Sequence, residues 1–171
     1  MGSHKNPAVR VTKDCGDLEI AILRDGTWLY RGTPIGRMPL VKLFASVLER
    51  DEEGVFWMRT PVEKGTVRVE DAPFVAVALD VEGSGREQVL RFRTNIDDTV
   101  EAGPDHAIRL GPDAASGVPI PYILVRKRLE ARVLRSVYYD LVELGCEEDV
   151  RGKSRFGVWS KGTFFPLDEE A

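Results

Sequence analysis

Two arginines separated by one residue are the strongest candidate for binding chemistry in this sequence. Arg91 and Arg93 alternate with Leu90 and Phe92 in the segment 88–94. Alternate side chains of a strand share one face and lie about 6.6 Å apart, so both guanidinium groups could contact one phosphate-sized anion, each with two parallel hydrogen bonds. The alternative is a solvated sheet face on which the arginines pair with carboxylates of neighbouring strands. Those carboxylates are Glu70, Asp80 and Glu82.

Polar residues follow this segment directly. Asn95 and Asp97 come after Thr94, at the point where we expect one half of the chain to meet the other. Amide and carboxylate groups at such a junction would orient a bound ligand. The alternative is an Asx turn that only reverses the chain.

Two further cations are candidates for the same anion. Arg37 stands two residues before Pro39, near the predicted start of a helix, where backbone N–H groups also favour anions. Lys64 could bring a point charge to the junction, with Glu63 orienting it. We favour a structural role for Lys64, because we read residues 63–65 as a turn and lysine before glycine is common in hairpin turns.

Other chemistry has little support in the sequence. His106 follows a Gly-Pro-Asp segment and has no serine or cysteine placed by a motif to act as its nucleophile. Cys15 and Cys146 stand apart from each other and from any metal-ligand spacing. The sequence also contains no P-loop and no His-Glu-x-x-His motif. We therefore expect no enzyme activity and no cofactor.

The elements that must position these residues can be read from the hydrophobic pattern. Apolar residues alternate through 18–30 around Asp25-Gly26, which predicts a hairpin. Helical periodicity begins at Pro39 and continues to Leu48. Strand-like segments follow; they are 55–60, 66–70, 74–81 and 88–94. A helix followed by a meander indicates an α+β fold.

The pattern of the second half is compatible with two different secondary structures. Residues 120–125 and 129–134 form a hairpin before a helix that Ser136 caps and Gly145 ends, or a single helix runs over 129–144. Comparison of the sequence with itself at an offset of 97 residues favours the hairpin. This offset aligns the two helix faces and also two Lys-Gly-Thr tripeptides, which begin at Lys64 and Lys161. We read a diverged duplication of hairpin, helix and hairpin. The predicted parts are an N-terminal half (15–86), a connecting strand and junction (87–106) and a C-terminal half (107–171).

Six segments, taken in this order, resemble an uncharacterised bacterial family, domain of unknown function 1285. The segments are Arg24–Trp28, Pro34–Arg37, Thr60–Gly65, Val69–Phe74, Arg91–Asn95 and Tyr139–Val142. The resemblance extends from about Cys15 to Leu167. The sequence departs from the family pattern at Ser136, where we expect proline before the second helix.

The resemblance implies two related α+β halves, the C-terminal one loosely similar to a pleckstrin-homology barrel. It also implies a ligand site at the junction of the halves and a role in bacterial signal transduction with a nucleotide-like ligand. No catalytic activity is established for the family, so the resemblance supplies a location for a site and no mechanism.

The composition limits the partners. The chain has 171 residues, 24 Lys and Arg, 28 Asp and Glu, and a net charge of −4, which argues against a DNA-binding or membrane-surface protein. The first 17 residues lack the apolar segment of a secretory signal, so we expect a cytoplasmic protein. Our prediction is a regulatory module that binds a nucleotide-like anion. The alternatives are a metal-assisted phosphoester hydrolase that uses Asp97 or Glu63, and a module that binds only another protein.

Overall fold

The computed structural model describes residues 13–169 and is predominantly β, with two short α-helices. The broad α+β expectation therefore holds, with strands in a clear majority. The strands are β1 (Lys13–Ile22), β2 (Trp28–Tyr30), β3 (Thr33–Pro34), β4 (Leu48–Arg50), β5 (Phe56–Arg59), β6 (Glu63–Val69), β7 (Phe74–Glu82), β8 (Val89–Thr94), β9 (Thr99–Glu101), β10 (Ile108–Pro112), β11 (Pro119–Arg126), β12 (Leu129–Val133), β13 (Cys146–Val150), β14 (Lys153–Ser160) and β15 (Thr163–Pro166). The helices are α1 (Met38–Ser46), α2 (Arg135–Glu143) and the 3₁₀ turn η1 (Gly85–Glu87).

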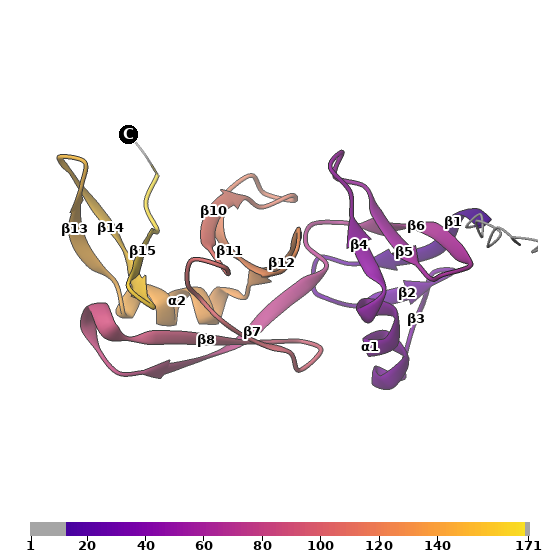
Figure 1. Ribbon diagram of the computed structural model, residues 1–171, viewed down its shortest axis with the longest axis horizontal. Helices are drawn as coiled ribbons and strands as arrows, with labels where there is room; N and C mark the ends of the chain where they lie inside the picture. Colours follow the sequence, from indigo (N-terminus) through magenta and orange to yellow (C-terminus); the bar gives the residue numbers. More distant parts are fainter. Residues whose placement is uncertain (1–12, 170–171) are drawn as a thin grey trace, which may run out of the picture.

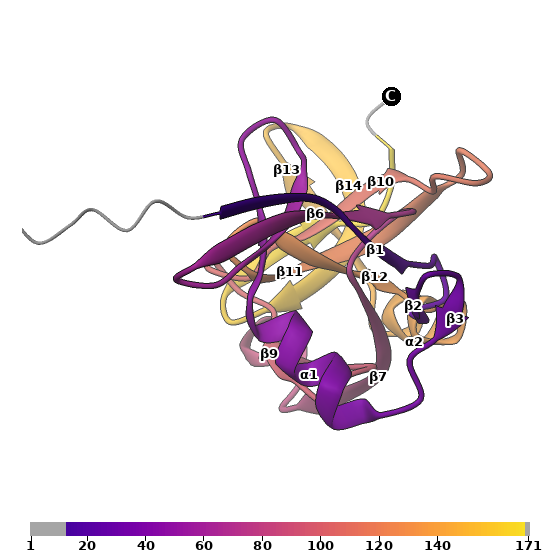
Figure 2. The ribbon, with the colours of Figure 1, turned by 90° about the vertical axis from the view of Figure 1, so that its right-hand side faces the viewer.

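The N-terminal sheet has six strands in the order β3-β2-β1-β6-β5-β4, with β1 and β6 parallel. The predicted turn after β1 is present, because Asp25 accepts a hydrogen bond from the Thr27 N–H at 2.9 Å and Gly26 adopts a φ of +93°. Helix α1 begins with Pro39 in its first turn and buries Val41 and Ala45. Figure 2 shows α1 on one side of β1 and β6.

Residues 74–169 contain two further sheets. One has six strands in the order β10-β11-β12-β7-β8-β9, and the other has the three strands β13-β14-β15. The halves follow each other along the long axis, with β7 leading from the N-terminal sheet into the second sheet and α2 lying beside it (Figure 1). The sequence places segment 74–81 in the N-terminal half, but β7 pairs with β8 and β12. The change of sheet therefore falls near residue 73 and not near residue 86.

One hydrophobic cluster contains buried residues of both halves, from Ile20 near the start to Leu167 near the end. Strand β8 shows how the sheets contribute to it. Leu90 and Phe92 are fully buried, while Arg91 and Arg93 lie on the opposite face. The predicted alternation in this strand is thus present.

The hairpin reading of the second half is correct. Leu129–Val133 is a strand because it pairs with β11 on one side and runs parallel to β7 on the other, and these long-range contacts outweigh its helical propensity. The predicted cap is wrong, however. Helix α2 begins at Arg135, its N-cap is Leu134, and no side chain caps it.

The proposed duplication is not confirmed, and neither is the pleckstrin-homology resemblance. Helices α1 and α2 do begin 97 residues apart and both have nine residues. The two shared tripeptides differ in structure, since Lys64-Gly65 lies within β6 whereas Lys161-Gly162 forms the turn between β14 and β15. The turn predicted at 63–65 is therefore wrong. Strands β4 to β6 also join the sheet of β1, while β13 to β15 form a sheet of their own.

Ser160 joins the three-stranded sheet to its six-stranded neighbour. Its fully buried hydroxyl accepts a hydrogen bond from the Leu90 N–H at 2.9 Å and donates one to the Ala102 carbonyl at 2.7 Å. We expect Ser160→Ala to lower the free energy of unfolding by about 2 kcal/mol, because two buried backbone groups lose their partner. Urea denaturation measures this. Ser154→Ala, at the exposed start of the same strand, is the control, and equal effects of the two substitutions would contradict the assigned role.

Candidate functional site

The two arginines of β8 face solvent and already have acidic partners. The Arg91 guanidinium donates to Glu101 at 3.1 Å and to Glu82 at 3.4 Å. The nearest carboxylate to Arg93, that of Asp97, is 3.9 Å away. The pairing with neighbouring strands that was the alternative reading therefore occurs for Arg91, and Arg93 is the freer of the two.

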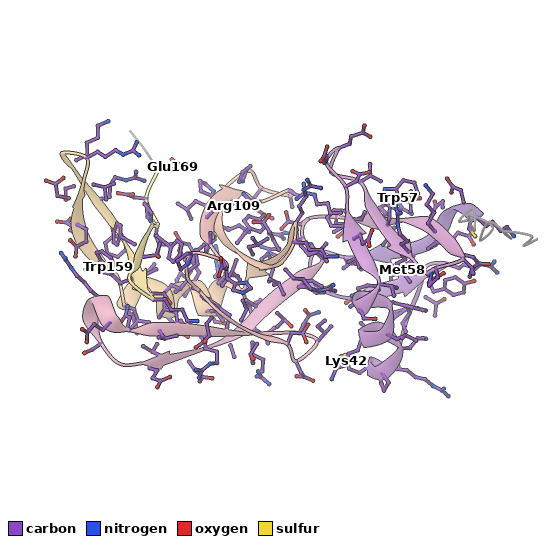
Figure 3. The ribbon with its side chains drawn as sticks, in the orientation of Figure 1. Lys42, Trp57, Met58, Arg109, Trp159 and Glu169 are labelled. Carbon is purple, nitrogen blue, oxygen red and sulfur yellow. The ribbon has the colours of Figure 1, made fainter. Side chains whose placement is uncertain are left out.

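Asn95 and Asp97 do lie where the two halves meet. The Asn95 side chain accepts a hydrogen bond from the Val75 N–H at 3.0 Å and donates to the Gly26 carbonyl at 3.3 Å, so its amide holds the β1–β2 turn against β7. Asp97 accepts a hydrogen bond from Lys42 of α1 at 3.2 Å. Lys42 is labelled in Figure 3, on the side of α1 nearest the C-terminal half.

The remaining two candidates lie elsewhere on the N-terminal half. Arg37 is exposed at the N-cap position of α1. The Lys64 ammonium lies 5.1 Å from the centre of the Trp57 ring, on the N-terminal sheet. The structure brings Arg93 close to Asp97, but it does not gather the six predicted residues around one cavity.

A cavity of about 460 Å³ lies at the junction and contains none of those six residues. One wall is Arg24, from the turn after β1. The other walls come from the loop between β10 and β11, from β12 and from the start of α2. The charged side chains of this junction cavity are Arg24, Asp113, Arg132 and Arg135, and its aromatic side chains are Tyr138 and Tyr139.

Asp113 is the only carboxylate in this lining, and it is already neutralised. Its side chain is 2% exposed. Arg24 donates to both carboxylate oxygens, the Nε bond being 2.7 Å long, and the Ser116 hydroxyl donates at 2.8 Å. Arg132 lies 3.8 Å away. The carboxylate thus ties the turn of Arg24 to the C-terminal half.

These contacts set the pKa of Asp113. Burial alone would raise it, but the hydrogen bonds from Arg24 and Ser116 and the charge of Arg132 outweigh burial and lower the pKa to about 2. The hydrogen bond to Asp113 in turn raises the pKa of Arg24. Both groups therefore remain charged at neutral pH.

Arg132 differs from Arg24 because its two ion pairs, with Asp71 and Asp113, are too long to be hydrogen bonds. Its side chain is 15% exposed, and its ion-pair distances to Asp71 and Asp113 are 3.7 and 3.8 Å, beyond hydrogen-bond range. Asp71 instead accepts a hydrogen bond from the Tyr122 hydroxyl at 2.8 Å. Burial and the Asp71 carboxylate raise the pKa of Tyr122, so this hydroxyl keeps its proton. A largely buried guanidinium with free donors facing a cavity is suited to bind an anion.

Sequence reasoning missed the residues of the junction cavity. Arg24, Asp113 and Arg132 are about 20 to 110 residues apart, and nothing in their local pattern shows that they meet. The one available signal was position, because Arg24 flanks the Asp25-Gly26 turn. Among residues 13–169, no group of three or more His, Cys, Asp or Glu side chains is arranged to hold a metal ion. Neither helix in that range has the length and hydrophobicity that a membrane span requires.

Comparisons with known proteins agree over nearly the whole chain. Residues 10–72 match the family described as "Domain of unknown function (DUF1285), N-terminal domain", and residues 73–167 match "Protein of unknown function (DUF1285), C-terminal domain". A search of curated proteins found no significant match.

Two solved structures are similar to this chain. A DUF1285 family protein from Silicibacter pomeroyi DSS-3 is 48% identical, with a TM-score of 0.84 over 96% of this chain and 89% of that one. A DUF1285 family protein from Shewanella baltica OS155 is 28% identical, with a TM-score of 0.55 over 72% and 90%. The family expected from the six sequence segments is confirmed, and the chain belongs to the DUF1285 family.

Proposed function

We propose that this protein is a binding module for a small anionic molecule, which it holds in the junction cavity between its two halves. The observation that carries the proposal is Arg132, a largely buried arginine that lines a cavity and makes no direct hydrogen bond to the two carboxylates that balance its charge. Burying such a charge is costly unless something pairs with it. Asp71 and Asp113 balance the charge but accept no hydrogen bond from Arg132, and a bound anion would accept one.

The charge of the lining supports an anionic ligand. Three arginines and one aspartate line the junction cavity, which gives a formal charge of +2 in a protein whose net charge is −4. The first turn of α2 contains no acidic residue, so the backbone N–H groups at the start of this helix add to the positive potential. Phosphate and carboxylate groups are the anions that arginine binds best.

Two tyrosines favour a ligand that carries a ring beside its charge. Tyr138 and Tyr139 line the same cavity, and Tyr139 is 58% exposed. An exposed tyrosine beside arginines can stack on a planar ring while the arginines hold the anion. This combination agrees with the nucleotide-like ligand that the family resemblance implies.

A regulatory role follows if the ligand contacts both halves. Arg24 belongs to the N-terminal half and Arg132 and Arg135 to the C-terminal half, so a ligand bound to all three would favour one arrangement of the halves. We propose that a protein partner in the cytoplasm reads this arrangement, as part of a bacterial signalling pathway.

Thermal unfolding with added ligands tests the proposal. The panel is nucleotides, cyclic dinucleotides, coenzymes and sugar phosphates, each with and without Mg²⁺. A ligand at 100 times its Kd stabilises the folded state by about 2.7 kcal/mol, so we expect a rise in Tm of roughly 5–10 °C for one anionic class. No shift with any member of the panel would contradict the proposal, and a shift that requires Mg²⁺ would favour the hydrolase alternative.

Substitution of Arg135 locates the ligand that the panel identifies. This exposed arginine at the start of α2 lines the junction cavity. We expect Arg135→Ala to weaken binding about tenfold, the effect of losing one charge-assisted hydrogen bond. Titration calorimetry measures the Kd.

Arg93→Ala is the matched comparison, since Arg93 is an exposed arginine of the site predicted from sequence. A loss of affinity in Arg93→Ala together with unchanged binding by Arg135→Ala would place the ligand on the face of β8 and contradict the proposed location.

A further inference from the structure

A second cavity, of about 510 Å³, runs along the edge of the second sheet. All five residues of β10 line it, together with residues of the loop before β11 and of the C-terminal segment after β15. Successive side chains of a strand point to opposite faces, so a cavity on one face of the sheet would contact only alternate residues. Because this cavity contacts every residue of β10, it follows the edge of that strand. Its volume lies within the range of about 300–1,000 Å³ that is typical of ligand clefts. We call it the β10 groove.

Strand β10 is the last strand of its sheet within residues 13–169. It pairs with β11 in an antiparallel register, and the pairs at its two ends are hydrogen-bonded through Leu124 N–H to Ala107 and Asp113 N–H to Val118. Hydrogen-bonded and non-bonded pairs alternate in such a ladder. The N–H and C=O groups of Ile108 and Leu110 therefore point away from β11, toward the groove.

The opposite wall is the chain end after β15. Asp168 is fixed there, because its carboxylate accepts hydrogen bonds from Arg155 at 2.6 Å and from the Phe156 N–H at 3.0 Å. Arg109, on the β10 side, is held in a two-pronged pair with Glu130 at 2.7 Å. Figure 3 labels Arg109 and Glu169, one from each wall. Three of the four charged residues of the groove are thus neutralised within the protein, and the rest of the lining is Ile108, Leu110, Gly111, Pro112, Gly117, Pro119 and Pro166.

We infer that the β10 groove binds an extended, largely uncharged segment of another protein, which adds to the sheet as a strand beside β10. Backbone groups directed into the groove would pair with the segment, and the apolar lining would contact its alternate side chains. A free sheet edge without such a partner is usually blocked by charge or by its neighbours. Two folded copies of this chain fit the edge less well than a single strand, because each copy would bring its own wall at 166–169 against the other.

The test uses the full-length protein and a phage-displayed library of random heptapeptides. We expect selection of peptides with apolar residues at alternate positions and few charges. One selected peptide is then synthesised and its Kd measured against wild type and Leu110→Pro, which removes an N–H that points into the groove and leaves the β11 ladder intact. We expect at least a tenfold loss of affinity in Leu110→Pro. Thr99→Pro is the matched control, because Thr99 begins β9 at the opposite edge of the same sheet.

Hydrogen exchange of the wild-type protein is a second test, and it needs no variant. Bound peptide should slow exchange of the Ile108 and Leu110 amides and leave that of the Thr99 amide unchanged. Equal binding by Leu110→Pro, no slowing at these amides, or failure to select any peptide would overturn the inference. So would a concentration-dependent dimer that Leu110→Pro abolishes, since it would assign the edge to a second copy of the chain.

Discussion

Replacing Asp113 with alanine is expected to lower the free energy of unfolding by about 3 kcal/mol. The carboxylate is 2% exposed and holds Arg24 and the Ser116 hydroxyl. Its removal leaves Arg132, 15% exposed, without one of its two compensating charges. Removal of one partner from a buried ion pair costs about 3–5 kcal/mol, and the lower end applies because Arg24 is 41% exposed and can turn toward water. Urea denaturation at pH 7 measures the change.

The same substitution should alter the pH dependence of stability. The pKa of Asp113 is lowered from 3.8 to about 2 in the folded protein, so its contribution is fully present above about pH 4 and is lost as the pH falls toward 2. That contribution is about 2 kcal/mol. The Asp113→Ala variant should lose less stability than wild type between pH 4.5 and 2.

Glu19→Ala is the control, since it removes an exposed partner of Arg31 and should cost less than about 1 kcal/mol. Identical acid sensitivity in Asp113→Ala and wild type would show that Asp113 does not contribute in this way.

Asp113→Ala should act in the opposite direction on the proposed ligand. The carboxylate is the only negative charge in the lining of the junction cavity, and it draws Arg24 toward itself. Its removal leaves an anion facing three arginines with no competing carboxylate in the cavity lining, so affinity should rise while stability falls. A fall in both quantities would instead indicate that the cavity collapses without Asp113.

Local features made much of the fold readable from the sequence. The Asp25-Gly26 turn, Pro39 at the start of α1 and the alternation in β8 each depend on residues close together in the chain, and all are present. The parallel pairings of β1 with β6 and of β12 with β7 join distant segments. No local periodicity encodes them, and so the assignment of β7 to the second sheet could not be read from the sequence.

The candidate site was harder to predict from the sequence than the fold, for a related reason. The spacing of Arg91 and Arg93 correctly gives a common face, but the partners of Arg91 come from β7 and β9 and are set by strand register. Asn95 was expected at the junction and does lie there, yet its amide holds two backbone groups. Arg132 alternates with buried neighbours in the same way as many surface residues. Its burial beside Asp71 and Asp113 depends on the fold that brings these distant residues together.

Several polar contacts join the two halves beside their shared hydrophobic core, and they bear on the proposed regulation. Arg24 with Asp113, Asn95 with Gly26, and Lys42 with Asp97 all join the two halves. A bound anion that competes with Asp113 for Arg24 can therefore shift the arrangement. A wholly apolar junction would resist such a shift.

Phe74→Ala is expected to lower the free energy of unfolding by about 3–5 kcal/mol, the usual cost of removing a fully buried phenylalanine ring. Phe74 begins β7, is completely buried and belongs to the core cluster that spans both halves. The Arg126 guanidinium lies 6.0 Å from its ring centre and also donates to the Ala45 carbonyl of α1. The substitution therefore removes packing at the point where the C-terminal sheet meets the N-terminal half.

Calorimetry tests whether the shared core makes the two halves one cooperative unit. Because the cluster is continuous, wild type and Phe74→Ala should each unfold in one transition, with the variant at a lower Tm. Phe74→Leu, which keeps most of the volume, should cost roughly 1 kcal/mol. Phe92→Ala, in β8, tests whether any core loss has the same result. Two separate transitions in Phe74→Ala, with one in Phe92→Ala, would show that Phe74 in particular couples the halves. Two transitions in wild type would show that the halves unfold independently and that the shared core does not make them one cooperative unit.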